Sequence, residues 1–102
     1  MIYVDEAVDY PPACIKLAAR RYGRLWCHMW AATPADEPAL HALAERIGLR
    51  RQWYQRHQVV SHYDLTPAWR AKAIAAGAVE RSMMSYLRER MQATSNQGDV
   101  KQ

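Results

Sequence analysis

The sequence predicts one small α/β domain, with a short, mostly parallel sheet of three to four strands flanked by helices. At 102 residues the chain has room for a single hydrophobic core. Its composition, 50% hydrophobic and 24% charged, is typical of globular domains. Short β-prone segments alternate with segments of helical periodicity, the pattern expected of strands joined by helical crossovers. Because every element is short, an α+β arrangement is the alternative.

The N-terminal part of the chain is predicted to form two strands around one helix. Residues 2–4 are β-prone, and residues 11–22 form a predicted helix. Gly23 ends this helix, because glycine adopts the left-handed conformation without strain. Residues 25–31 are apolar except for His28, as expected of a strand buried on both faces.

The remainder of the domain is predicted to continue the alternation. Residues 36–47 form a helix whose acidic first turn favours the helix dipole. A basic loop leads to a strand over 59–65, and a threonine followed by a proline begins a helix over 66–77. A short strand over 78–80 and a final methionine-rich helix from residue 83 complete the domain.

We expect a single domain over residues 2–92 and a disordered polar tail over residues 93–102. The tail is rich in threonine, serine, asparagine, glutamine and glycine, which bury too little apolar surface to fold. Neither an internal repeat nor a linker divides the rest of the chain.

Histidines and aspartates in separate elements predict one polar site. Imidazole is both the commonest metal ligand and the side chain that titrates nearest neutral pH. Side chains alternate along a strand, so the imidazole and the carboxylate of the 59–65 strand share a face. In open parallel sheets, ligands gather beyond the carboxyl ends of the strands. We therefore expect a site there, built from Asp5, His28, His41, His62 and Asp64.

A metal site is the first hypothesis for these residues. Asp5, His62 and Asp64 are the expected ligands, and His62 and Asp64 are also the expected catalytic residues. Neutral histidine and carboxylate suit a divalent metal such as zinc or manganese, and such a site leaves positions for water or substrate. The spacing matches no established motif such as HExxH. Hydrolysis of a phosphoester is the reaction expected of such a site.

A metal-free pocket and a purely structural role are the alternatives. In the pocket, His28 and His41 contact a ligand, while Arg50 and Arg70 bind its phosphate or other anionic group. In the structural interpretation, each histidine is a partly buried residue whose ring nitrogens are satisfied by hydrogen bonds. Cys27 adjoins His28, but adjacent strand residues point to opposite faces, which excludes a thiol–imidazole pair.

Several separated motifs carry a family resemblance. They lie, in order, at residues 3–5, 23–29, 37–41, 47–50, 53, 62–67, 70 and 77–78. Over about residues 2–82 the chain resembles the domain-of-unknown-function family numbered 4031, which occurs in bacteria and their phages. The resemblance implies no activity. It maps the recurring positions of the family onto Asp5, Trp26, His28, His41, Arg50, His62, Tyr63, Asp64 and Arg70.

Charge supports a second class of function, a non-enzymatic accessory protein that binds nucleic acid or another protein and is related to phage. The net charge is +4, and residues 46–56 contain four arginines, two aromatic residues and no acid. Arginines interleaved with aromatics can bind phosphate and stack on bases. The methionine-rich last helix would suit homodimerisation.

We expect a cytoplasmic protein with no membrane partner. No apolar run approaches the roughly 18 residues that span a bilayer. The N-terminal segment is acidic where a signal peptide would be basic, and two cysteines make no disulfide framework.

Overall fold

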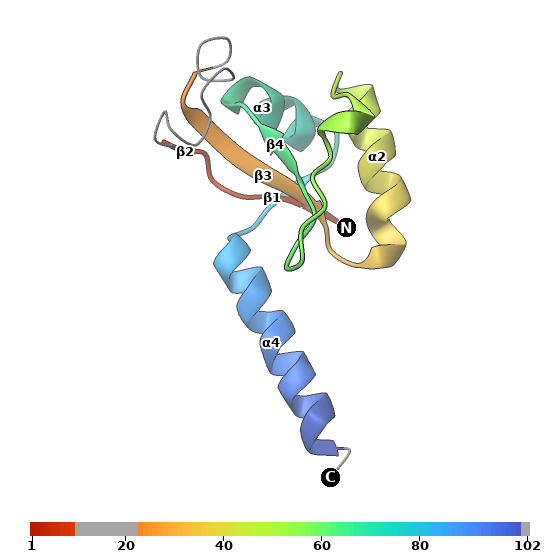
Figure 1. Cartoon of the computed structure of the whole chain (residues 1–102). Helices are drawn as coiled ribbons and strands as arrows, with labels where there is room; N and C mark the ends of the chain where they lie inside the picture. The colour runs from red at the N-terminus through yellow and green to blue at the C-terminus, as the bar shows by residue number, and fades with distance from the viewer. Residues whose placement is uncertain (10–22, 101–102) are drawn as a thin grey trace.

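The computed structural model describes residues 1–9 and 23–100 (Figure 1). The predicted first helix, over residues 11–22, lies outside the described residues. In chain order the elements are β1 (Ile2–Val4), β2 (Val8–Asp9), β3 (Leu25–Ala31), the 3₁₀ turn η1 (Pro34–Asp36), α2 (Glu37–Arg46), the 3₁₀ turn η2 (Arg51–Trp53), β4 (Tyr63–Leu65), α3 (Pro67–Ala75), β5 (Val79–Glu80) and α4 (Met83–Val100).

The sheet is mixed, and β3 is its central strand. β1, β2 and β4 all pair with β3 in antiparallel orientation, whereas β5 pairs with β1 in parallel. Met29 opposes both Val4 and Tyr63, which places β1 and β4 on opposite edges of β3. The prediction of a mostly parallel sheet is therefore wrong, and the arrangement is of the α+β kind. An alternation of strands and helices does not by itself fix the direction of the strands. Here the long segment after α2 brings the chain back so that β4 runs antiparallel to β3.

β1 continues into β2 along the same strand of the sheet, with a bulge between them. From the Val4–Met29 pair to the Val8–Trp26 pair, the chain advances four residues on one side and three on β3. One extra residue is therefore accommodated between β1 and β2. Asp5 begins this bulge, and bulges of this kind redirect side chains.

The two faces of the sheet pack against different elements. On one face, α2 and α3 cover the larger apolar cluster, which includes Val4, Cys27, Met29, Leu40, Leu43, Tyr63, Leu65 and Ala73. On the other face, the first turns of α4 cover a smaller cluster of Trp30, Val60 and Tyr86, with Tyr3 packed against it. The rest of α4 extends away from the sheet (Figure 1).

Local signals account for where several elements begin and end. At the start of α3, the backbone N–H of Trp69 donates to Thr66 Oγ1 over 3.4 Å, so Thr66 is the expected N-cap. Gly77, just beyond α3, has a φ of +115°, the backbone conformation that glycine tolerates best. The predicted strand over 59–65 is shorter than expected, because only Tyr63–Leu65 pairs continuously with β3.

The last helix covers part of the segment for which a tail is predicted. α4 spans Met83–Val100, and so includes residues 93–100. The division into a domain over 2–92 and a tail over 93–102 stays a prediction. Within the described residues, no helix combines the length and the apolar character that crossing a membrane requires.

Candidate metal centre

Four polar side chains lie side by side: His28 in β3, Asp64 in β4, Asp5 directly after β1 and His62 directly before β4. His28 in β3 stands directly opposite Asp64 in β4. On the other edge of β3, the backbone N–H of Asp5 donates to the carbonyl oxygen of His28 over 3.1 Å. His62 precedes Asp64 by two residues and so faces the same side of the sheet. The group therefore lies in a row across the middle of the sheet, and not at the carboxyl ends of parallel strands as the sequence predicts.

This group lies on the sheet face opposite α2 and α3. Cys27 and Met29 flank His28, and Tyr63 and Leu65 flank Asp64. All four of these flanking side chains are buried in the cluster beneath the two helices. Because strand side chains alternate, His28 and Asp64 must point the other way. Burial raises the pKa of the Cys27 thiol to about 12, and Cys27 points to the opposite face of β3 from His28, as expected of adjacent strand residues.

Asp5 fixes the orientation of the His28 ring. One carboxylate oxygen of Asp5 accepts the backbone N–H of His28 over 2.6 Å, and the other lies 2.8 Å from His28 Nδ1. A carboxylate only accepts hydrogen bonds, so Nδ1 carries the hydrogen. The Asp5 side chain is only 14% exposed, which strengthens the contact. A histidine held in this way by a carboxylate presents Nε2 as its basic nitrogen.

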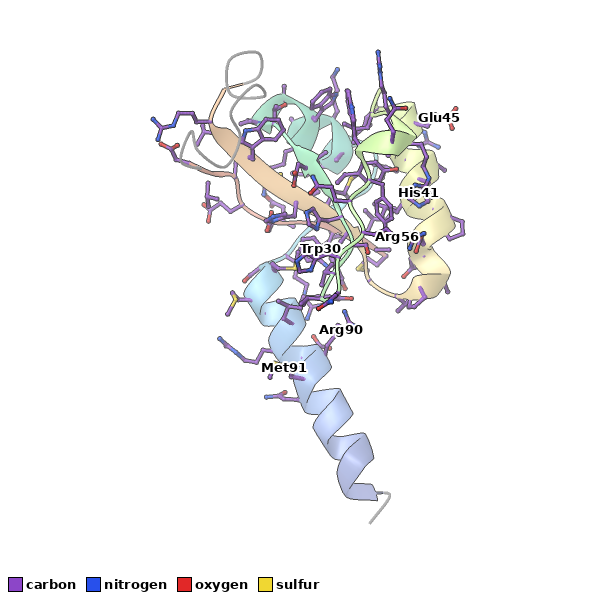
Figure 2. All side chains as sticks on the ribbon, viewed as in Figure 1. Trp30, His41, Glu45, Arg56, Arg90 and Met91 are labelled. Atoms are coloured by element: carbon purple, nitrogen blue, oxygen red, sulfur yellow. The ribbon has the colours of Figure 1, made fainter. Side chains whose placement is uncertain are left out.

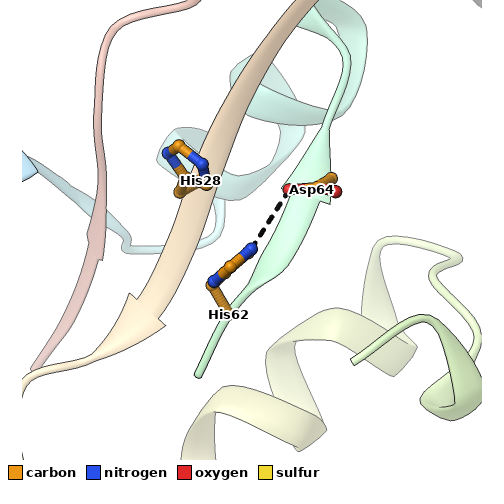
Figure 3. A group of neighbouring side chains, drawn as sticks. All are labelled: His28, His62 and Asp64. Carbon is orange, nitrogen blue, oxygen red and sulfur yellow. Dashed lines mark ion pairs between the residues drawn. The ribbon is translucent and has the colours of Figure 1, made fainter. Parts of the chain in front are cut away.

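The ring of His62 is held by the backbone. Its Nδ1 lies 2.9 Å from the carbonyl oxygen of Val60, which can only accept, so Nδ1 is again the donor. Nε2 then lies 3.4 Å from Asp64 Oδ1 (Figure 3). In a neutral ring this would set a lone pair against a carboxylate oxygen. The arrangement is favourable when Nε2 carries a proton or when a cation lies between the two atoms.

The pKa values of this pair shift in the directions that favour its charged forms. The hydrogen bond to Asp64 raises the pKa of His62 above its ordinary value, despite partial burial. Burial acts to raise the pKa of Asp64, but hydrogen bonds from His62 and Gln55 outweigh it and lower the pKa overall. Opposite charges and hydrogen bonds stabilise the ionised form of each partner.

Three of these residues lie close enough together to be candidate metal ligands. One donor atom each from His28, His62 and Asp64 lies within 4.8 Å of the others. Ligands at about 2.1 Å from a tetrahedral zinc ion are about 3.4 Å apart. The His62–Asp64 separation of 3.4 Å already matches this value. The rings of His28 and His62 meet edge to face, with their centroids 4.8 Å apart.

The grouping differs from the predicted ligand set in one member. The sequence predicts Asp5, His62 and Asp64 as ligands, and the structure groups His62 and Asp64 with His28. Asp5 instead contacts His28 on the β1 side of β3, where its carboxylate accepts a hydrogen bond from Nδ1 of the ring. His28 is in the middle of its strand, a position that offers no signal of a site unless the neighbouring strands are known.

His41 lies apart from this group, on α2 (Figure 2). Its Nδ1 is 2.7 Å from the hydroxyl oxygen of Tyr63, and its Nε2 is 3.3 Å from a carboxylate oxygen of Glu37. Tyr63 points to the opposite face of β4 from His62. The structure therefore does not bring His41 together with the other predicted site residues.

The two arginines predicted to bind an anion have other contacts. The Arg50 guanidinium lies 5.7 Å from the centroid of the Trp53 ring. Arg70 donates from Nε to the backbone carbonyl of Asp5 over 2.7 Å and from Nη2 to Glu80 over 2.9 Å. Arg70 thus touches the candidate site, through the backbone of Asp5.

Sequence reasoning missed Gln55. An isolated antiparallel bridge joins Gln55 to His62, the residue just before β4. The two residues exchange backbone hydrogen bonds of 2.8 and 3.0 Å. The Gln55 side chain donates to the other carboxylate oxygen of Asp64. A lone glutamine in a basic loop carries no sequence signal of such a role.

Comparison with known families supports the resemblance seen in the sequence. The family model described as Protein of unknown function (DUF4031) matches residues 13–94, which is most of the chain. The chain belongs to the DUF4031 family. His28, His62, Asp64 and Arg70 lie in the matched range, and Asp5 precedes it. Neither the curated proteins nor the solved structures gave a match.

Proposed function

We propose that this DUF4031 protein binds a divalent metal ion through His28, His62 and Asp64. The observation that carries the proposal is the donor set itself: two imidazoles and a carboxylate whose donor atoms lie within 4.8 Å. Each imidazole has its Nδ1 held by an acceptor, Asp5 for His28 and the Val60 carbonyl for His62. Such partners are typical of metal-binding histidines, because they fix the tautomer and leave Nε2 to bind.

The donor atoms favour zinc, with manganese as the alternative. Imidazole nitrogen suits zinc and several other transition metals, whereas carboxylate oxygen also suits manganese. Three protein ligands leave at least one coordination position for water or substrate, as in catalytic rather than structural zinc sites.

The ligand class that we propose is a phosphate-containing molecule. A metal ion with an open position can polarise a phosphoryl oxygen and make bound water a stronger nucleophile, so hydrolysis of a phosphoester is the reaction that follows. Arg70 donates its hydrogen bonds to Asp5 and Glu80 in this structure, so we assign recognition of the anion first to the metal. The net charge of +4 also favours an anionic ligand.

The metal content of untagged protein tests the proposal. Elemental mass spectrometry should find near-stoichiometric zinc or manganese in the unaltered protein and a loss of metal in His62→Ala. His41→Gln is the matched control, because it removes an imidazole from the opposite face of the sheet and should retain the metal. Circular dichroism verifies that each variant is folded. Equal metal content in the folded His62→Ala variant, or none in any of the proteins, contradicts the proposal.

A second candidate, nucleic-acid binding, is favoured by a specific surface. Within residues 50–56, guanidinium groups lie over aromatic rings at three places: Arg50 over Trp53, Arg51 over Tyr54 and Arg56 over Tyr54, at 5.7, 5.2 and 5.5 Å from the ring centroids. Arginine stacked in this way can still offer edge N–H groups to phosphate and a flat surface to bases, although Arg56 also donates from Nη2 to Glu37 over 3.2 Å.

Binding of a fluorescent single-stranded oligonucleotide tests this candidate. The affinity should fall steeply with salt, because bound phosphates release counterions. A variant carrying Arg50→Gln and Arg51→Gln should bind more weakly than one carrying Lys72→Gln and Arg88→Gln, which loses the same charge elsewhere. Equal loss in both variants would show attraction to net charge alone.

A further inference from the structure

The Asp5 carboxylate meets His28 at a point where the strand is irregular. Asp5 begins the bulge between β1 and β2: its N–H still donates to the His28 carbonyl over 3.1 Å, but the N–H of His28 donates to the Asp5 carboxylate and not to the Asp5 carbonyl. Yet both of its carboxylate oxygens lie within hydrogen-bond distance of His28, one at the backbone nitrogen and one at the ring. The backbone carbonyl of Asp5 is therefore not paired with His28 N–H, and a contact from outside the sheet holds it instead.

That contact comes from Arg70. Its Nε donates to the backbone carbonyl of Asp5 over 2.7 Å, a charge-assisted hydrogen bond from a side chain only 21% exposed. Arg70 stands in the first turn of α3, where its backbone N–H donates to the carbonyl of the N-cap Thr66 over 2.9 Å. Its Nη2 donates to Glu80 in β5 over 2.9 Å. The Arg70 backbone is therefore held in α3 and its Nη2 is held by Glu80, and these two contacts fix the position of the Nε that donates to Asp5.

We propose that Arg70 is a positioning residue, which holds the bulge at Asp5 so that the Asp5 carboxylate orients the His28 ring. The expected effect on metal affinity rests on the proposed function. The contacts from Arg70 to Asp5 and from Asp5 to His28 do not depend on it. This positioning role replaces the role expected from the sequence, in which Arg70 binds an anionic ligand.

A double-mutant cycle on metal affinity tests this chain. Removal of a partner that orients a metal-binding histidine typically costs about 10–100-fold in affinity. Asp5→Asn should fall in this range, and Arg70→Met near its lower end, at about tenfold, because it acts one step further away. In the Asp5→Asn background, Arg70→Met should cost less than about twofold more, since residues that act through one chain are not additive.

Glu80→Gln is the matched control for the Arg70 substitution. It removes the carboxylate that anchors Nη2 but leaves the Nε contact with Asp5, so it should change zinc affinity less than Arg70→Met does. If Arg70→Met does not fold, Arg70→Lys takes its place, since one ammonium cannot reach both Asp5 and Glu80. Zinc affinity unchanged in the folded Arg70 variant, or losses that add fully with Asp5→Asn, would overturn the inference.

A metal-free measurement separates this inference from the proposed function. Long-range ¹H–¹⁵N spectra of the histidine rings report which ring nitrogen carries the hydrogen. At mildly alkaline pH, His28 should carry it on Nδ1 in the unaltered protein and show a mixture of tautomers in Arg70→Met, while His41 is unchanged in both. An unchanged His28 tautomer in Arg70→Met overturns the inference whether or not zinc binds. Failure of the unaltered protein to bind zinc, with the tautomer shift present, overturns the proposed function and leaves the positioning role standing.

Discussion

At the scale of residues, the candidate site depends on which nitrogen of each histidine is held. Both Nδ1 atoms face acceptors, Asp5 for His28 and a backbone carbonyl for His62. The two Nε2 atoms are then the basic ones. This arrangement turns two strand histidines into potential ligands, whereas the same side chains with Nε2 held would point their basic nitrogens elsewhere.

The His62–Asp64 pair predicts how the stability of metal-free protein depends on pH. The folded-state pKa of His62 lies above its ordinary value of 6.5, because of the hydrogen bond to Asp64. Its contribution to the free energy of unfolding is therefore full below pH 6.5 and is lost as the pH rises through the raised value. Asp64, whose folded pKa is lowered, contributes above its ordinary value of 3.8 and loses that contribution as the pH falls through the lowered value.

Urea unfolding of chelator-treated protein across the neutral range measures this dependence. The free energy of unfolding should decrease from mildly acidic to mildly alkaline pH, and the decrease should be smaller in His62→Gln. A His62→Gln variant with the same pH dependence as the unaltered protein would show that the pair does not titrate as described.

Residue periodicity predicts only part of this site. The two-residue spacing of His62 and Asp64 places them on one face, and the structure does so. The addition of His28 could not be predicted, because it depends on the register of β3 against β4. Arg70 was predicted to bind an anion from its charge alone, while its contact with Asp5 joins residues 65 positions apart in the chain.

At the scale of elements, cap and glycine signals in the sequence predict where helices begin and end. The alternation of strands and helices does not predict the direction of the strands. The strand over 25–31 is found at the predicted residues, and the Thr66 cap begins α3 where expected. The direction of β4 is set by the segment of residues 47–62, whose path depends on tertiary contacts such as the bridge between Gln55 and His62. The expectation of a parallel sheet therefore failed, and with it the expected place of the site.

The alternation of β4 predicts that its two faces act independently. On the helix side, the Tyr63 hydroxyl donates to His41 Nδ1, since the carboxylate of Glu37 accepts from Nε2. Tyr63→Phe leaves that nitrogen without its donor and should cost about 1–2 kcal/mol of unfolding free energy.

The same substitution should leave zinc affinity unchanged, because it alters only the face away from His62 and Asp64. Calorimetric zinc titration and urea unfolding of Tyr63→Phe check both expectations. A clear loss of zinc affinity at retained fold would mean that the two faces are coupled.

At the scale of the whole molecule, α4 covers the sheet with its first turns and then extends away from it (Figure 1). Met84 and Met91 are 66% and 70% exposed, and their spacing of seven residues, close to two helical turns, puts them on one side of the helix. Met91 is labelled in Figure 2. Homodimerisation through this helix stays a prediction from the sequence. Analytical ultracentrifugation should show a dimer that Met91→Glu dissociates, and a monomer at every concentration would contradict it.

The central claim is that His28 and His62 bind one metal ion through Nε2. Zinc titration followed by ¹H–¹⁵N spectra of the histidine rings tests it most directly. The account predicts that the Nε2 signals of His28 and His62 shift together and saturate at one equivalent of zinc, while those of His41 stay in place. Shifts confined to the exposed His57, or equal in all four histidines without saturation, would contradict the claim.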